Sequence, residues 1–202
     1  MDQNFNVPRN IVRNPRVGGN MINKAIEKEC NFTTQRLLVN TWKQTESIEL
    51  EKSFIKKVIK ILSPNITKAL PDDWQNINTL DKAESWINQR KEESHFITIE
   101  LLATSELIGF IFLYESSKEN NYYNLRFGYL LAEEVWGEGL GTELIAGLVK
   151  CCESKGNIKS ISGGVEKNNI ASIKVLEKNR FSISKKEKST KEMIFYEYEL
   201  DI

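Results

Sequence analysis

The sequence of 202 residues lacks a net charge, because 28 Lys and Arg balance 28 Asp and Glu. Without an overall positive field, nothing favours nucleic acid or an anionic membrane as a partner, so any bound anion must be held by a local device. The sequence also lacks an uninterrupted apolar run near the roughly 18 residues that cross a membrane. Its N-terminus has no apolar segment typical of a secretory signal. We therefore expect a soluble, cytoplasmic protein.

Cysteine and histidine are scarce. The three cysteines, Cys30, Cys151 and Cys152, have neither metal-ligand spacing nor the even count of a disulfide framework. We predict reduced thiols and no metal site, with Cys151 and Cys152 packed in or near the core rather than acting as nucleophiles. The single histidine, His95, precedes an expected strand and is interpreted as a surface residue rather than a catalytic base.

The first 20 residues are rich in Asn, Pro and Gly and show no sustained apolar period. Such composition predicts a flexible arm over residues 1–30. Residues 31–202 are expected to form one domain, since the chain is short for two. Their apolar patterns predict, in order, a strand, two helices, three strands, a helix, a strand, a helix and two strands. This mixture indicates an α/β or α+β fold with helices layered on a mostly antiparallel sheet.

Two helices carry specific signals. Thr79 is a plausible N-cap for the second helix, where Asp81 in the first turn suits the helix dipole. The first helix shows an apolar face at period 3.6, which predicts burial of Ile48, Phe54, Ile55, Val58, Ile59 and Leu62.

The stretch VWGEGLGTEL places three glycines, Gly137, Gly139 and Gly141, directly before a helix-forming run. A helix N-terminus has unpaired N–H groups and a partial positive charge, both suited to phosphate. Glycines before it allow positive φ angles and leave no Cβ in the way of a ligand. The pattern therefore suggests a diphosphate site, although such turns also occur only to pack a helix closely on a sheet. A dinucleotide fingerprint does not fit, because GEGLGT is not G-x-G-x-x-G and no run of βαβ units surrounds it.

The extended stretch FGYLLAEEVWGEGLGTEL resembles the acetyl-CoA-binding signature of the GNAT N-acetyltransferases, with Trp136, Gly139 and Gly141 in its slots. Tryptophan in the first slot is similar to the RimJ/RimL-like branch. Downstream, NIASIKVLEKNRF resembles that branch's Asn-x-x-Ser followed by Glu-Lys-x-Gly-Phe, and upstream TTQRLLV and SELIGFIFL resemble its first strand and a hairpin arm. The resemblance runs from about Phe32 to the C-terminus.

The resemblance implies a GNAT fold, in which the central strands near 125–132 and 160–166 splay apart like a V and helices cover both faces of the sheet. It implies acetyl-CoA (coenzyme A) as co-substrate, with pantetheine along the backbone of Tyr129, Leu130 and Leu131. Asn169 and Ser172 are expected near the cofactor. The diphosphate is expected on the N–H groups of Trp136, Gly137, Glu138, Gly139, Leu140, Gly141 and Thr142.

The implied reaction is direct attack of a primary amine on the thioester, with backbone N–H groups at Leu130 and Leu131 polarising the carbonyl. The family's usual acid, a tyrosine seven residues after the motif asparagine, falls on Leu176. In the RimL-like branch the motif serine has a comparable role, so the resemblance implies Ser172 as the candidate acid. Among carboxylates that could serve as the base, Glu166 ranks ahead of Glu100 and Glu133.

A second departure is Arg180, where the family commonly has a helix-ending glycine. We expect Asn179 to take the left-handed position instead. For the acceptor, Trp74, Asp72 and Asp73 offer either an aromatic wall with carboxylates or a solvated turn with one docked indole.

The resulting prediction is an N-acetyltransferase acting on a protein or peptide N-terminal amine, or on a small-molecule amine. The alternative is a non-catalytic acyl-CoA-binding or interaction protein on the same fold. The resemblance also allows a homodimer, for which no interface is assigned.

Overall fold

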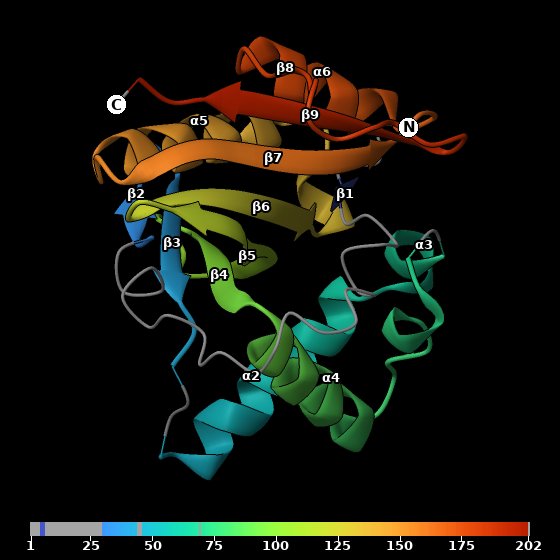
Figure 1. The fold of residues 1–202 in the computed structure, drawn as a ribbon. Helices are drawn as coiled ribbons and strands as arrows, with labels where there is room; N and C mark the ends of the chain where they lie inside the picture. The colour runs from blue at the N-terminus through green and yellow to red at the C-terminus, as the bar shows by residue number, and fades with distance from the viewer. Residues whose placement is uncertain (1–4, 7–29, 44–45, 69, 202) are drawn as a thin grey trace.

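One mixed sheet organises the protein. The computed structural model describes residues 5–6, 30–43, 46–68 and 70–201 (Figure 1). Apart from residues 5–6 and Cys30, the predicted arm 1–30 lies outside this range. The strands are β1 (Phe5–Asn6), β2 (Phe32–Thr33), β3 (Leu37–Thr41), β4 (His95–Leu101), β5 (Leu107–Glu119), β6 (Tyr122–Leu131), β7 (Ile158–Glu166), β8 (Ser182–Ile183) and β9 (Met193–Glu199). The helices are α2 (Ile48–Ile61), α3 (Pro64–Thr67), α4 (Leu80–Glu93), α5 (Leu140–Glu153) and α6 (Ile170–Lys178).

The described strands follow the order β2-β3-β4-β5-β6-β7-β9-β8, with β1 added to β6. All pairings are antiparallel except that of β6 with β7. This confirms the predicted fold class. The predicted strand after Phe181 is reduced to the two residues of β8.

The strands β6 and β7 separate halfway along their length. Their parallel pairing runs only to the pair Arg126 and Ser162, while β6 continues to Leu131 and β7 to Glu166. Beyond that pair, β6 is held by β5 on one side and β7 by β9 on the other. The predicted V-shaped opening therefore lies between the ends of these two strands.

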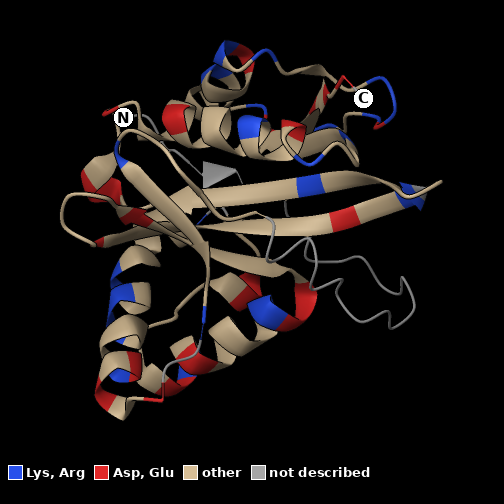
Figure 2. Ribbon diagram, turned by 90° about the vertical axis from the view of Figure 1, so that its left-hand side faces the viewer, with Lys and Arg blue, Asp and Glu red and all other residues tan. Residues whose placement is uncertain are grey.

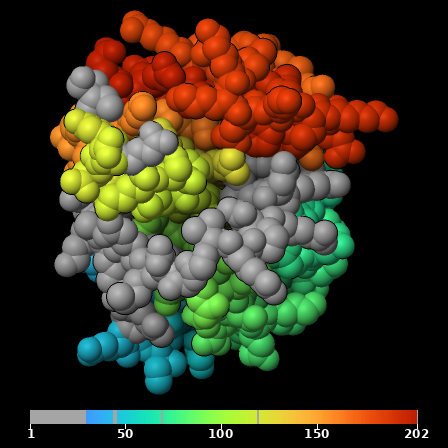
Figure 3. Space-filling view, in the orientation of Figure 1, coloured from blue at the N-terminus to red at the C-terminus, as the bar shows by residue number. Residues whose placement is uncertain are grey.

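Helices cover both faces of the sheet. Seen from the side in Figure 2, α2 and α4 lie on one face and α5 and α6 on the other, with charges of both signs on their outer surfaces. Thr79 caps α4 by accepting a hydrogen bond from the Lys82 N–H at 3.3 Å, as its sequence predicted. In the space-filling view, the C-terminal residues form one end of the molecule and α2 to α4 the other (Figure 3). No helix in the described part of the chain is long and apolar enough to cross a membrane.

An aromatic cluster fastens α4 to the sheet. The Trp86 ring lies 5.8 Å from that of Phe96 and 6.1 Å from that of Phe112, measured between centroids. Trp74, which precedes α4, adds a ring 5.0 Å from Phe112 and 5.2 Å from Trp86. Burial of these aromatic rings stabilises the packing of α4 on the sheet and fixes the position of the segment between α2 and α4.

Three expectations at single residues are wrong. Ile48 is 72% exposed, because it is the first residue of α2, whose buried residues begin only at Ile55. His95 is buried rather than on the surface, since β4 begins under α4. Asn179 keeps a negative φ of −92°, and Arg180 takes the left-handed conformation with φ +64°. The Asn179 amide instead donates to the carbonyl oxygens of Thr142 and Val175, which holds it in place.

Replacing Arg180 by glycine should stabilise the protein. A left-handed non-glycine residue costs about 1 kcal/mol, so Arg180→Gly should raise the free energy of unfolding by about 0.5–1 kcal/mol in urea denaturation. The neighbouring Asn179→Gly, which removes two hydrogen bonds and has no positive φ to relieve, should lower it. A destabilised Arg180→Gly protein would contradict the strain assigned to this position.

Stability should fall in acid because of His95. Burial lowers its pKa from 6.5 to about 4. Between these two pKa values His95 is protonated in the unfolded chain but neutral in the folded chain, which favours unfolding. The free energy of unfolding is therefore unaffected by this group above pH 6.5 and falls as the pH drops toward 4. Between about pH 7 and about pH 4.5, His95→Gln should lose roughly 2 kcal/mol less unfolding free energy than the unmodified protein. Parallel pH profiles of the two proteins would refute this assignment.

Candidate active site

The open edge of β6 forms one wall of the V. The N–H of Ala132 donates to the carbonyl of Ile108 in β5, and the N–H of Tyr123 donates to that of Asn157 on the β7 side. Because backbone groups alternate sides along a strand, Leu130 faces β5 while Tyr129 and Leu131 face the opening. The predicted site residues Tyr129, Leu130 and Leu131 are thus brought to the V, but only two of them present backbone groups to it.

The glycine turn begins just beyond this edge. Gly137 and Gly139 have φ of +82° and +79°, and Gly139 is the N-cap of α5. An added Cβ would meet nothing within 4 Å at Gly137 and only Arg36 Nη2 at 3.9 Å from Gly139, so the turn is open to a ligand. The N-cap of α5, Gly139, has no side chain to accept from the helix, whereas Ser47, Ser63, Thr79 and Asn169 cap the other described helices. The cap residue therefore leaves the first N–H groups of α5 to another acceptor.

Arg36 adds a positive charge to this turn. Its Nη1 donates to the carbonyl of Glu138 at 3.1 Å, and its Nε pairs with Glu143 at 2.7 Å. Burial raises the pKa of Glu143, but hydrogen bonds from Thr34 and Arg36 outweigh it and hold this pKa below its ordinary value. Glu143 therefore stays ionised and keeps the guanidinium beside the glycines. Trp136 joins the glycine turn to the end of β6, since its Nε1 donates to the Leu131 carbonyl at 2.8 Å.

The start of α6 meets β6 on the face covered by α5. The Asn169 side chain accepts a hydrogen bond from the Ser172 N–H at 3.0 Å and so caps the helix. The Ser172 hydroxyl is fully buried and lies 3.5 Å from the Tyr129 hydroxyl, which donates to it in a long hydrogen bond. Burial raises the pKa of Tyr129 to about 12, despite the hydrogen bond to Ser172, so the phenol is protonated at neutral pH.

The three ranked carboxylates lie in different places. Glu166 is half-buried at the end of β7, on the far wall of the V. Glu133 follows the end of β6, where its carboxylate accepts hydrogen bonds from Ser63 and Asn65 and so ties α3 to the strand. Glu100 lies on β4, two strands away from β6, beside a pocket of about 430 Å³. Only Glu166 and Glu133 are brought to the mouth of the V.

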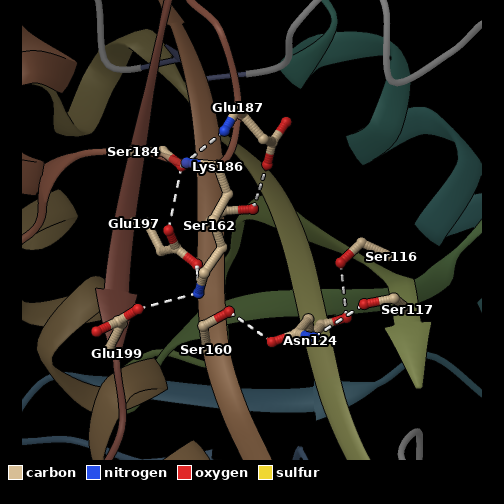
Figure 4. Close-up of polar contacts among 10 residues, drawn as sticks. All are labelled: Ser116, Ser117, Asn124, Ser160, Ser162, Ser184, Lys186, Glu187, Glu197 and Glu199. Atoms are coloured by element: carbon tan, nitrogen blue, oxygen red, sulfur yellow. Dashed lines mark hydrogen bonds and ion pairs between the residues drawn. The ribbon is translucent and has the colours of Figure 1, made fainter. Parts of the chain in front are cut away.

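A polar network covers the other face of the sheet at the apex of the V. Ser162 on β7 donates to Glu187 at 3.0 Å, and Ser160 donates to Asn124 on β6 at 2.8 Å (Figure 4). Glu187 also pairs with Arg126, the last β6 residue in register with β7. The segment between β8 and β9 is thereby fastened across both central strands at the point where they separate.

Other candidates lie in the interior. Trp74 is fully buried in the aromatic cluster, and Asp73 pairs at 2.9 Å with the buried Arg90, so this segment is a docked indole rather than an aromatic wall. Cys30, Cys151 and Cys152 are buried and form no disulfide among the described residues. A hydrogen bond with Cys151 and burial raise the pKa of the Cys30 thiol, and burial raises that of Cys152, so neither is a ready thiolate.

Several site residues escaped sequence reasoning. Arg36 is distant in sequence from the glycine turn, and the Arg126–Glu187 pair joins β6 to the segment between β8 and β9. The side chain of Tyr129 was overlooked because the motif concerns its backbone. One sequence feature could have indicated the position of the Tyr129 side chain: residues alternate along a strand, so Tyr129 and Phe127 lie on the same face of β6.

The arrangement suits an extended ligand with an anionic end. The uncapped helix N-terminus, the left-handed glycines and Arg36 can hold a diphosphate. The open β6 edge can pair with a chain that carries amide groups, as an added strand does. A buried hydroxyl pair and a carboxylate flank that edge and can move protons.

The comparisons agree with this geometry. A family model of the acetyltransferase (GNAT) domain matches residues 49–182. No curated protein matches the sequence at a significant level.

Solved structures share the fold. A GNAT-family acetyltransferase from Bacillus anthracis has a TM-score of 0.64 at 14% identity, covering 84% of this chain and 98% of that chain. The microcin C7 self-immunity acetyltransferase MccE, solved with acetyl-CoA and AMP, has a TM-score of 0.59 at 14% identity, with 82% and 93% covered. YncA of Salmonella typhimurium, solved with its cofactor acetyl-CoA, has a TM-score of 0.55 at 15% identity, with 82% and 94% covered. At these identities the likeness concerns the fold.

Proposed function

Because the chain belongs to the GNAT acetyltransferase family, we propose that it transfers the acetyl group of acetyl-CoA to a primary amine by direct attack on the thioester. The acceptor is either a peptide N-terminal amine or a small-molecule amine. The proposal includes a RimJ/RimL-like ancestry, which the Trp136-Gly137 pair supports, and a cytoplasmic location.

One observation carries this proposal: the edge of β6 that β7 leaves unpaired leads within a few residues into a helix whose N-cap, Gly139, has no side chain. A ligand with a diphosphate and a peptide-like arm needs both features in that order. The open space at Gly137 and Gly139 supports the fit, because an added Cβ would crowd no neighbour among the described residues, so close packing does not require a glycine at either position. The rival interpretation of this turn as helix packing alone gains no support from that space.

Each part of the cradle has a role in the proposal. When bound, acetyl-CoA supplies the thioester carbon that an amine attacks. The N–H groups at the start of α5 and the Arg36 guanidinium hold the diphosphate. Tyr129 and Leu131 present backbone N–H groups to the opening, so they rather than Leu130 hydrogen-bond the arm and polarise its carbonyl.

The proton transfers use two sides of the V. Glu166 takes a proton from the acceptor ammonium, directly or through water, which leaves a neutral amine. A nitrogen–carbon bond then forms and the carbon–sulfur bond breaks. Ser172 gives its proton to the departing sulfur, the neutral Tyr129 phenol beside it stabilises the serine oxygen, and the proton that the newly acylated nitrogen must lose returns to that oxygen. Tyr129 thus assists Ser172, which acts as the acid because Leu176 stands where other family members have a tyrosine.

The acceptor is proposed to approach from the face opposite α5 and α6. That face carries the Arg126–Glu187 pair at the apex of the V and the α3 segment at its mouth. The segment between β8 and β9 then contacts the acceptor, as Glu187 belongs to it. A homodimer is compatible with this approach but has no assigned interface.

Substitutions should lower turnover while leaving acetyl-CoA binding intact. Ser172→Ala and Glu166→Gln should each reduce kcat about tenfold or more, because each removes a proton transfer in the transition state. Tyr129→Phe should reduce kcat less, by about threefold to tenfold, because the serine remains. The measurement is thiol release from acetyl-CoA across a panel of peptide and small-molecule amines, with KM for acetyl-CoA recorded for each variant.

Ser94→Ala is the matched control. Its hydroxyl is also buried and hydrogen-bonded, but it donates to the Arg90 carbonyl at the end of α4, outside the V and its polar network, and should leave kcat unchanged. A chain that binds acetyl-CoA yet acetylates no amine, and is indifferent to Ser172→Ala, would favour the non-catalytic alternative.

A further inference from the structure

The N-terminal segment adds a strand inside the V. Phe5 pairs with Leu130 and Asn6 with Tyr129, antiparallel to β6. This short strand, β1, has neighbours on both β6 and β7, so it lies between the strands where they have separated (Figure 1). Residues far from the rest of the domain in sequence therefore occupy the opening at its centre.

The pairing uses the backbone groups that the open edge exposes. Tyr129 faces the opening, so Asn6, which lies opposite it, is in the position where two antiparallel residues exchange N–H to carbonyl hydrogen bonds. Phe5 lies opposite Leu130, whose backbone groups face β5. By the same alternation, the Phe5 N–H points away from β6.

We propose that the open edge of β6 is a binding site for the chain's own N-terminal segment, and that this segment and the pantetheine arm of acetyl-CoA exclude one another. The exclusion rests on the proposed function, because it requires the arm to use the same edge. Tyr129 has one N–H and one carbonyl on that side, and the Leu131 carbonyl already accepts from Trp136. Two extended chains cannot both pair with this stretch.

Mutual exclusion has a measurable consequence. When another segment occupies a site in most molecules, only the remaining molecules can bind the ligand. The apparent Kd is then the intrinsic Kd divided by the fraction of molecules in which the site is vacant. If residues 5–6 occupy the edge in about nine molecules of ten, the apparent Kd for acetyl-CoA is about tenfold weaker than the intrinsic one. Weakening the strand should therefore strengthen cofactor binding.

The test compares three substitutions in the full chain by calorimetric titration with acetyl-CoA. Asn6→Pro removes the N–H that donates to Tyr129 and should tighten binding about fivefold to tenfold. Phe5→Pro is the matched control, since it adds the same ring one residue earlier, where the N–H does not face β6. Asn6→Ala keeps the backbone donor. Both controls should bind as the unmodified chain does.

A second measurement follows the pairing without acetyl-CoA. Amide hydrogen exchange at Tyr129 should be slow in the unmodified chain and faster in Asn6→Pro, while Leu130, which bonds to β5, stays slow in both. Equal Kd values in Asn6→Pro and the unmodified chain would overturn the exclusion, and equal exchange at Tyr129 would overturn the pairing. Absence of acetyl-CoA binding in all four proteins would reject the exclusion together with the proposed function, whereas slow Tyr129 exchange would still support the pairing.

Discussion

The loss of pairing between β6 and β7 beyond Arg126 and Ser162 is the constraint on which the rest of the site depends. A buried backbone N–H or carbonyl without a partner costs free energy, so a strand edge left open in the middle of a sheet calls for another chain or ligand. Each strand is secured on its outer side, by β5 and by β9, which keeps the opening in place. The Arg126–Glu187 pair then fixes its apex.

The anion site follows from the same strand. Trp136 hydrogen-bonds the last β6 carbonyl that faces the opening, which sets the direction in which the chain leaves the sheet. Two left-handed glycines turn it into α5, and Arg36, held by Glu143, brings a guanidinium to the turn. A chain without net charge thus offers an anion the backbone dipoles of one helix end and one guanidinium, which Glu143 holds beside the glycines.

The sequence predicted most of the order of the elements, because this depends on local periods, but not β1, α3 or the division of the first strand into β2 and β3. Thr79 as a cap and the glycine turn are likewise local features. Contacts between distant segments could not be predicted: Arg36 with the glycine turn, Tyr129 with Ser172, and Glu187 with Arg126 each join residues on separate elements. Arg180 shows the limit for backbone conformation, since the hydrogen bonds that fix Asn179 arise from α5 and α6 packing together.

The most direct test of the account is calorimetric titration of the intact chain and of Gly139→Glu with acetyl-CoA. Gly156→Glu is the control, because Gly156 has a similarly positive φ of +65° and open space around it but lies beyond the other end of α5. The account predicts micromolar binding to the intact chain and to Gly156→Glu, and none to Gly139→Glu, whose carboxylate would stand in the diphosphate cradle. Equal binding by all three folded proteins, or binding by none, would contradict it.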